Sequence, residues 1–151
     1  MASNFNGDKI NVLLNSCEKG DLKIVRALIE RDRMDVNVSD EYGNTALQVA
    51  AANDQVCKTV THLDSWRIVQ SISRNFYFKM DILKYLIKSK ANVNQQNHHG
   101  WAPIHHASLY GHNEIIKELM KNKALFKIRN KLGASPLNIS IASSHLSTFK
   151  Y

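Results

Sequence analysis

Histidine is the residue type in this chain that could most readily do chemistry. Five of the seven histidines lie close together in the sequence: His98, His99, His105, His106 and His112. Imidazole is a common metal ligand, so such a cluster raises the question of a metal site. No cysteine lies nearby, however, and no spacing of two histidines and a carboxylate recurs. We therefore expect no metal ion and no other cofactor.

The sequence does not indicate a catalytic centre. It contains no Gly-x-Ser-x-Gly elbow, no phosphate-binding Gly-Lys-Ser/Thr loop, no dinucleotide fingerprint and no His-Glu-x-x-His pair. Ser144 and His145 are neighbours in the chain, but adjacency does not place an imidazole base on a hydroxyl nucleophile. We expect the chain not to be an enzyme.

Basic residues outnumber acidic ones, which gives a net charge of +7. Six basic residues lie within one stretch: Lys117, Lys121, Lys123, Lys127, Arg129 and Lys131. A positive patch attracts acidic partners over about a Debye length, although lysines beside an apolar helix stripe are also the usual solvated face of a helix. We therefore expect a protein partner with an acidic surface, and neither nucleic acid nor a small-molecule substrate.

A glycine turn recurs three times along the chain. Residues 40–51, 97–108 and 130–141 align on Gly43, Gly100 and Gly133, and the last two glycines are 33 residues apart. A period of about 20–50 residues is typical of stacked repeats.

Apolar helix stripes recur at the same 33-residue offset. One stripe consists of Ile82, Leu83, Leu86 and Ile87, and the next of Ile115, Ile116, Leu119 and Met120. No single repeat could bury such a stripe alone, so we expect repeats to stack side by side. The side chains that we expect to be buried between repeats are Leu47, Ile104, Leu137, Ile82, Leu86, Ile115 and Leu119.

This succession of motifs resembles the ankyrin repeat. The matching features are a turn glycine, a Thr-Pro-Leu-His-like turn, a helix of small residues, a Gly-His break, a second apolar helix and an Ala-x-Val-Asn exit. The best copy covers residues 97–129 and departs mainly at Ala102, where Thr is usual, and at Lys123, where Gly is usual. The resemblance covers nearly the whole chain apart from one inserted block. It implies an all-α solenoid of paired antiparallel helices with short hairpin-like loops.

The resemblance also gives two of the histidines structural roles. His105 matches the turn histidine, which usually bonds to the turn Thr and to neighbouring backbone, and His112 matches the Gly-His break. We expect this turn network to be weakened in every copy, because Gln48 stands where His is usual and Ala102 gives His105 no hydroxyl.

We predict a single domain over residues 1–151. Repeat one covers residues 6–39, repeat two 40–96, repeat three 97–129 and partial repeat four 130–151. Repeat one has its first helix around residues 11–18 and lacks the glycine turn, so we interpret it as a cap with a polar outer face. One extra residue is expected in its exit loop over residues 30–36. Repeat four stops before its second helix, so the sequence looks like the front of a longer array or a product cut short.

Repeat two contains a 24-residue insertion. Gly43 and Gly100 are 57 residues apart, and omitting residues 56–79 places Ile82 in register with Ile115. The block begins with Val56 and ends with Lys79. A Val codon begins with GT and a Lys codon can end in AG, so the two ends of the block resemble the borders of a short retained intron. The alternative is a genuine insertion with an extra helix over residues 65–74. Deleting residues 56–79 distinguishes the two, because an intron-derived segment can be lost without loss of stability or of partner binding.

The resemblance implies that a partner docks on the loop tips and the inner-helix face. By position these residues are Glu41, Tyr42, Asn44, Asn53, His98, His99, Trp101, Leu109, Tyr110, Lys131 and Leu132. Trp101 and Tyr110 are the strongest expected anchors, because aromatic side chains at interface centres carry much of the binding energy. The alternative for Trp101 is that it packs across the repeat boundary.

We expect a non-catalytic adaptor or scaffold module that binds another protein. The alternatives are an ankyrin-type regulator of transcription factors and the interaction domain of a larger signalling enzyme. The strings NHHGW and NKLGAS are similar to the amino-terminal ankyrin arrays of scaffold proteins that also carry a SAM domain. No SAM-like segment lies within these 151 residues, so self-association through such a domain is not implied.

The sequence favours a cytoplasmic location, with the nucleus and the cilium or cytoskeleton as alternatives. No apolar run reaches membrane-spanning length, and the first residues are polar, unlike a secretory signal. Cys17 and Cys57 lack paired spacing, which indicates reduced thiols.

Overall fold

Paired helices follow one another along the chain in the computed structural model, which describes residues 3–52 and 80–144. The elements are α1 (Ser3–Lys19), α2 (Leu22–Arg26) with its π-helical continuation η1 (Ala27–Arg31), α3 (Ala46–Ala52), a helix over residues 80–88, α5 (Pro103–Tyr110), α6 (Asn113–Lys121) and α7 (Pro136–Ala142). In the described part of the chain, the extended structure consists of one isolated bridge between Ser39 and Thr45. The all-α repeat fold expected from the sequence is therefore confirmed.

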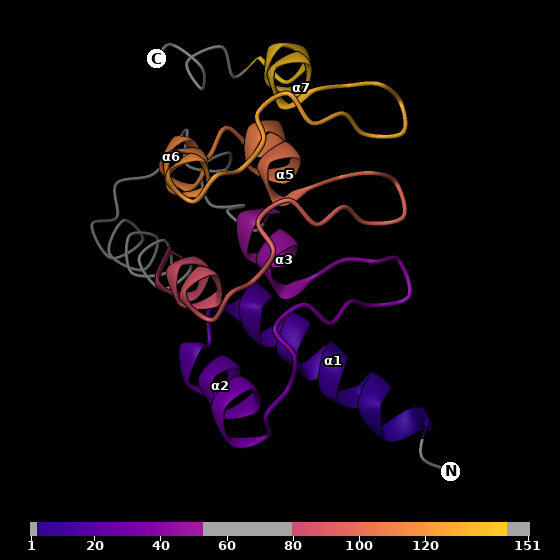
Figure 1. Ribbon diagram of the computed structural model, residues 1–151, viewed down its shortest axis with the longest axis vertical. Helices are drawn as coiled ribbons and strands as arrows, with labels where there is room; N and C mark the ends of the chain where they lie inside the picture. Colours follow the sequence, from indigo (N-terminus) through magenta and orange to yellow (C-terminus); the bar gives the residue numbers. More distant parts are fainter. Residues whose placement is uncertain (1–2, 53–79, 145–151) are drawn as a thin grey trace, which may run out of the picture.

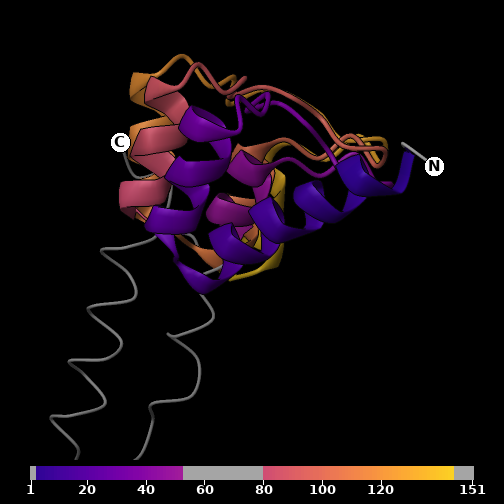
Figure 2. The ribbon, with the colours of Figure 1, turned by 90° about the horizontal axis from the view of Figure 1, so that it is seen from below.

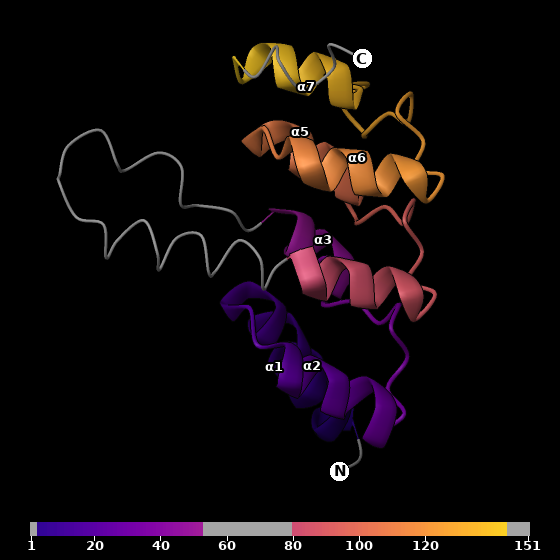
Figure 3. The same cartoon turned by 90° about the vertical axis from the view of Figure 1, so that its left-hand side faces the viewer.

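The helices form two layers. Figure 1 shows the first helices of the repeats, α1, α3, α5 and α7, stacked one above another, and successive members of this layer pack directly together. Figure 3 shows the second layer, in which α2, residues 80–88 and α6 are stacked in the same order. The loops that precede α3, α5 and α7 all project to one side of the layers (Figure 2).

Local sequence explains where these short helices begin and end. Pro103 and Pro136 occupy the first turn of α5 and α7, where the missing N–H has no helical partner to lose. Gly111 ends α5 with a φ of 72°, a left-handed conformation that glycine adopts without a steric clash. No described helix is long and apolar enough to cross a membrane.

The apolar side chains predicted for the repeat boundaries lie in the core, with one exception. Those that are at most 2% exposed are Leu47, Ile104, Ile82, Leu86, Ile115 and Leu119. Leu137 was also predicted to be buried, and this prediction is wrong, because its side chain is 45% exposed. It lies on α7, the last element of the described stack, so no described repeat covers the face on which Leu47 and Ile104 are buried in earlier repeats.

The first helix is longer than the sequence predicts. We expected a helix around residues 11–18, whereas α1 has 17 residues and begins at Ser3, about two turns earlier. The added turns run toward the side on which the loops project, as Figure 2 shows. Repeat one thus has additional helix where the other repeats have a glycine loop.

The extra residue of repeat one lies in the end of its second helix. Lys90 follows Leu86 by four residues in repeat two, whereas Arg33 follows Leu28 by five in repeat one. Lys90 and Arg33 both end their helices with positive φ, at 69° and 52°. A π turn in η1, with Asp32 N donating to the Ala27 carbonyl oxygen at 3.1 Å, absorbs the additional residue instead of the loop that we expected.

The predicted 24-residue insertion over residues 56–79 lies outside the described residues. The helix that follows it keeps the register inferred from the sequence, since Ile82 and Ile115 are both buried at matching positions. The boundaries assigned to the four repeats stay a prediction, and the matching positions of Ile82 and Ile115 agree with them.

Candidate functional site

Three loop tips lie in a row along one edge of the stack (Figure 1). The backbone N–H of His98 donates to the carbonyl oxygen of Tyr42 at 2.9 Å, and that of Lys131 donates to the carbonyl oxygen of His99 at 3.1 Å. Each tip is therefore bonded to the next, and we call this row the tip ridge: residues 41–42, 98–99 and 131–132.

Each tip is also closed internally by the side chain that begins its loop. Asn97 Oδ1 accepts hydrogen bonds from the backbone N–H groups of His99 and Trp101, at 3.0 and 2.9 Å. Asp40 and Asn130 make the same pair of bonds in their own loops. Because side-chain oxygens fix the backbone of every loop, the tip ridge is a preorganised surface.

Asn44 belongs to this framework. Its Oδ1 accepts from Asn97 Nδ2 at 2.8 Å, and its Nδ2 donates to Asp40 Oδ2 at 3.0 Å. Its side-chain amide thus links two loops, whereas its neighbours on the ridge point outward.

The turn glycines allow the tips to approach closely. Gly43 and Gly100 have φ of 79° and 77°, and a Cβ built on Gly100 would lie 2.7 Å from the backbone nitrogen of Lys131. A Cβ on Gly43 would similarly meet His98 at 2.9 Å. Only glycine fits both the conformation and the space at these two positions.

The remaining predicted tip residues are exposed. They are Glu41, Tyr42, His98, His99, Lys131 and Leu132, with Tyr42 exposed by 57% and Leu132 by 89%. The charge changes along the ridge from the carboxylate of Glu41 through two imidazoles to the ammonium of Lys131. The ridge therefore offers an apolar side chain at each end and opposite charges beside them.

The predicted aromatic anchors lie at opposite ends of α5. Trp101 is partly buried, and its ring centroid lies 5.8 Å from that of His105 and 5.1 Å from that of His106. Tyr110 is partly buried and stacks on His112, with centroids 5.7 Å apart. An eight-residue helix such as α5 is about 12 Å long, so the two rings cannot fill one pocket.

The inner-helix residues that complete the prediction are only partly accounted for. Leu109 is partly buried near the end of α5. Asn53 lies outside the described residues. The structure thus brings the tip residues together in one row and places Trp101, Leu109 and Tyr110 on the neighbouring helix.

The turn network in repeat two is complete, which differs from our expectation. Gln48 Oε1 accepts from the backbone N–H of Thr45 at 2.8 Å, and Gln48 Nε2 donates to the carbonyl oxygens of Gln95 and Trp101 at 2.9 and 2.7 Å. A glutamine amide thus provides one acceptor and one donor group at the place where the repeat usually has histidine.

His105 makes the corresponding contacts in repeat three less well. Its Nδ1 accepts from the backbone N–H of Ala102 at 3.0 Å, which leaves Nε2 as the protonated nitrogen. Burial lowers the pKa of His105, and backbone groups of Ala134 and Ile128 oppose this shift. Nε2 has no partner with good hydrogen-bond geometry among the described residues, so these backbone interactions are weaker than those of Gln48.

His106 is also held neutral. Burial and the neighbouring charge of His105 lower its pKa to about 4, and its Nε2 is buried without a hydrogen bond among the described residues. In the described part of the chain, no three His, Cys, Asp or Glu side chains are arranged to hold a metal ion.

The sequence missed a recess beside the first tip. Gly7, Ile10 and Asn11 of α1 line it together with residues 39–42, and its volume is about 340 Å³. It exists because α1 continues past the first loop, and the only sequence signal for this continuation is the absence of a glycine turn from repeat one.

Comparison with known families agrees with this architecture. The family model described as ankyrin repeats (3 copies) matches residues 2–65 and 71–151. Among curated proteins, none matches the chain. The family match and the stacked helix pairs together show that the chain belongs to the ankyrin-repeat family.

Proposed function

We propose that this chain is a non-catalytic adaptor or scaffold module that binds a partner protein through the tip ridge and the adjoining inner-helix face. Ankyrin repeats are generally protein–protein interaction modules. The observation that carries the proposal is the tip ridge itself, because exposed Tyr42 and Leu132 are mounted on loops that are bonded to one another.

Rigidity is what makes this surface suitable for recognition. Binding costs less conformational entropy when the contacting loops are already ordered. The tip-to-tip bonds of His98 and Lys131 order the loops before a partner arrives. An exposed aromatic or aliphatic side chain on such a support can act as an anchor.

The partner that fits best has an acidic surface opposite the later repeats. Lys131 and Arg129 are exposed beside the third tip, and Arg129 Nη1 donates to the carbonyl oxygen of Gly133 at 2.6 Å. Glu41 and Asp40 at the first tip require a neutral or basic region of the same partner. A cytoplasmic location is part of the proposal, and the buried free thiol of Cys17 is compatible with a reducing compartment.

The proposal can be tested by affinity capture from cell extract with and without nuclease. Proteins retained by the wild-type chain after nuclease treatment are direct protein partners. The Tyr42→Ala, Leu132→Ala double variant should weaken their binding by about thirtyfold, as expected for the loss of hot-spot contacts worth about 2 kcal/mol. The Trp101→Ala, Tyr110→Ala variant tests the inner-helix face in the same assay.

A matched control removes two exposed apolar side chains away from the ridge. Leu125 and Phe126 are exposed by 57% and 47%, and the Leu125→Ala, Phe126→Ala variant should retain every partner. Equal loss of binding in the control and the ridge variant would place the interaction elsewhere, and retention that depends on intact nucleic acid would contradict a direct protein contact.

A further inference from the structure

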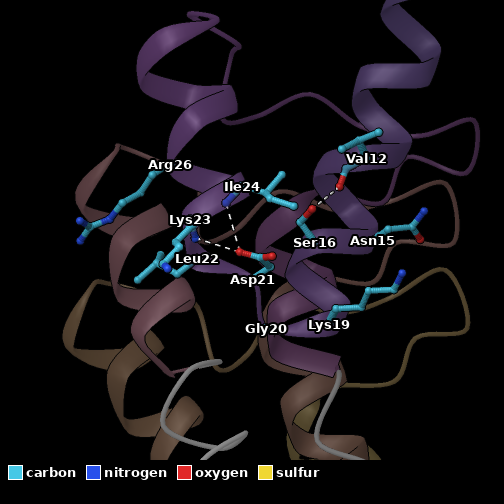
Figure 4. A pocket seen from close by; sticks show the side chains of 10 residues that line it. All are labelled: Val12, Asn15, Ser16, Lys19, Gly20, Asp21, Leu22, Lys23, Ile24 and Arg26. Atoms are coloured by element: carbon cyan, nitrogen blue, oxygen red, sulfur yellow. Dashed lines mark hydrogen bonds between the residues drawn. The ribbon is translucent and has the colours of Figure 1, made fainter.

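The outer face of repeat one contains an open groove between α1 and α2. The groove has a volume of about 840 Å³ and lies at the N-terminal end of the stack. Figure 4 shows Ile24 on α2 pointing toward Ser16 on α1, with Val12 one turn away along α1. The Ser16 hydroxyl donates to the carbonyl oxygen of Val12 at 2.7 Å, so its proton is already engaged. We call Val12, Ser16 and Ile24 the floor of the groove.

This floor is a repeat interface that no described repeat covers. Ile24 is 41% exposed, whereas the matching Ile82 and Ile115 in repeats two and three are 0% and 2% exposed. Val12 is 46% exposed, whereas the matching Pro103 is buried. In later repeats the preceding repeat covers these positions. The polar outer face that we expected of a capping repeat is therefore interrupted by apolar surface.

The mouth of the groove is positively charged. Lys19 lies at the end of α1, and Lys23 and Arg26 lie on α2, all three exposed. Arg26 points away from α1, and its guanidinium carbon lies 5.2 Å from the ring centroid of Tyr85. Figure 4 shows the Lys19 side chain on the side of α1 that faces away from α2, so the exposed ammonium groups of Lys19 and Lys23 border the groove.

One carboxylate lies in the groove and is already engaged. Asp21 Oδ1 accepts from the backbone N–H groups of Lys23 and Ile24 at 3.1 and 3.2 Å, which caps the start of α2. These two donors satisfy part of its charge. The lining contains three cationic side chains against this single anionic one.

A second copy of the chain is a poor occupant. Head-to-tail stacking would place the last described repeat of one chain, which contains α7, on this groove, in the position that a preceding repeat has inside the array. Residues 119–151 contain no Asp or Glu, while exposed Lys127, Arg129 and Lys131 lie in the last described repeats. Two basic surfaces would then meet, which is unfavourable.

We propose that this groove is a second docking site, separate from the tip ridge, and that it binds an acidic amphipathic helix of another protein. Apolar side chains of that helix cover Val12 and Ile24, and its carboxylates face Lys19 and Lys23. The helix takes the place that a preceding repeat occupies elsewhere in the array. It thereby removes apolar surface from water while pairing opposite charges at the rim.

Synthetic peptides provide a direct test. The probe is a fluorescein-labelled helical peptide of about 18 residues with leucines on one face and glutamates on the other. Two matched peptides replace every glutamate by lysine or every leucine by glutamine. Fluorescence anisotropy at low salt should show binding of the leucine–glutamate peptide alone.

Variants of the chain then locate the site. Lys19→Glu combined with Lys23→Glu should weaken binding at least about tenfold, and Ile24→Gln should weaken it at least about fivefold. The control, Lys123→Glu with Lys127→Glu, makes the same change of charge at two exposed lysines outside both the groove and the tip ridge and should stay within about twofold of wild type. All of these side chains except Ile24 are exposed lysines, and circular dichroism verifies the fold of each variant.

Four outcomes would overturn the proposal. Equal weakening by the control variant would mean that the peptide recognises net charge alone. Unchanged binding in the variant with Lys19→Glu and Lys23→Glu would rule out the acidic helix as the specific ligand. So would a short oligonucleotide that competes with the peptide on the wild-type chain and does not bind this variant. A dimer in sedimentation velocity that Val12→Asp dissociates would assign the groove to a second copy.

Discussion

Gln48 on α3 donates its side-chain amide to the carbonyl oxygen of Trp101, in the following repeat, at 2.7 Å. The same amide nitrogen donates to the carbonyl oxygen of Gln95 at 2.9 Å. One buried side chain thus ties the second repeat to the loop that carries the second tip. The position of the tip ridge depends on this connection, because the Trp101 carbonyl also closes its own loop by accepting from Asn97 N–H at 2.9 Å.

Removing the Gln48 amide should destabilise the array strongly. Gln48→Ala leaves the N–H of Thr45 and the carbonyl oxygens of Gln95 and Trp101 without this partner inside the protein, and we expect a loss of about 2–4 kcal/mol in unfolding free energy. Urea denaturation measures it. Gln48→His should retain more of the stability than Gln48→Ala, because an imidazole nitrogen can accept from the N–H of Thr45 as His105 Nδ1 accepts from that of Ala102.

The matching position in the last repeat provides a control. Asn138 is exposed, and its side-chain oxygen accepts from the Ser135 hydroxyl at 2.8 Å. Asn138→Ala should cost less than about 1 kcal/mol. A cost equal to that of Gln48→Ala would show that the inter-repeat bonds add nothing to stability.

Burial should separate two leucines that the repeat pattern treats alike. Leu119 is fully buried in α6, and Leu119→Ala should cost about 2–5 kcal/mol in a denaturant titration. Leu137 is 45% exposed, and Leu137→Ala should cost less than about 1 kcal/mol. Similar losses of unfolding free energy for both variants would contradict the exposure of the Leu137 side chain.

Two of the turn glycines should likewise differ. Gly100→Ala combines a positive φ with a contact of 2.7 Å to the backbone of Lys131, so it should push the tips apart and cost about 2–4 kcal/mol. Gly133 has a similar φ of 76° but open space around it, and Gly133→Ala should cost about 1 kcal/mol. Thermal unfolding of the two variants compares them directly, and equal costs would show that the close approach of the tips carries no energy.

The sequence predicts those parts of this fold that depend on one repeat alone. Helix pairs, loop glycines and three of the four residues in the α6 stripe, Ile115, Ile116 and Leu119, follow from local periodicity, whereas Met120 of the same stripe is 43% exposed. The burial of Leu137 does not, because it depends on whether a neighbouring repeat covers it. The completeness of the Gln48 network was missed for another reason, since the usual motif contains His and does not show that an amide can provide the same donor and acceptor.

The candidate site was predictable to a similar degree. Tip residues such as His98 and Lys131 could be found from their distance to the turn glycine. The role of Asn44 could not, because its side chain bonds to a residue 53 positions away in the sequence. The groove at Ile24 was also unpredictable from periodicity, because the same apolar position is buried in the other repeats.

Lysines that end two helices in a left-handed conformation offer a route to stabilisation. Lys90 and Lys123 have φ of 69° and 68°, at the place where the ankyrin repeat usually has glycine. Lys123→Gly should raise the unfolding free energy by about 0.5–1 kcal/mol, because relief of the steric clash exceeds the added entropy of the unfolded chain.

The control for this change is a lysine in ordinary helical conformation. Lys84 is exposed within the helix over residues 80–88, and Lys84→Gly should lower stability by about 1 kcal/mol. Opposite signs for the two substitutions, measured by urea denaturation, are the expected result. Destabilisation by both would argue against strain at Lys123.

Acidification should weaken the array through its buried imidazoles. The native pKa of His106 is lowered to about 4 by burial and by the neighbouring charge of His105, whose own pKa burial also lowers. In the unfolded chain both titrate near their ordinary value of about 6.5. Between about pH 6.5 and 4 the unfolded state therefore binds more protons than the native state, and the unfolding free energy falls as the pH falls. His106 alone accounts for up to about 3 kcal/mol of this loss.

Replacing His106 by the residue found at the matching position of repeat four isolates this effect. His106→Ile places an apolar side chain where Ile139 is buried one repeat later. The variant should lose clearly less stability than the wild type between pH 7 and pH 4, as measured by urea denaturation at each pH. Asp32, whose pKa is lowered mainly by its hydrogen bond from Lys9, titrates below this window and should affect both proteins equally. Parallel stability curves for the two proteins would show that His106 is protonated as easily in the folded chain as in the unfolded one.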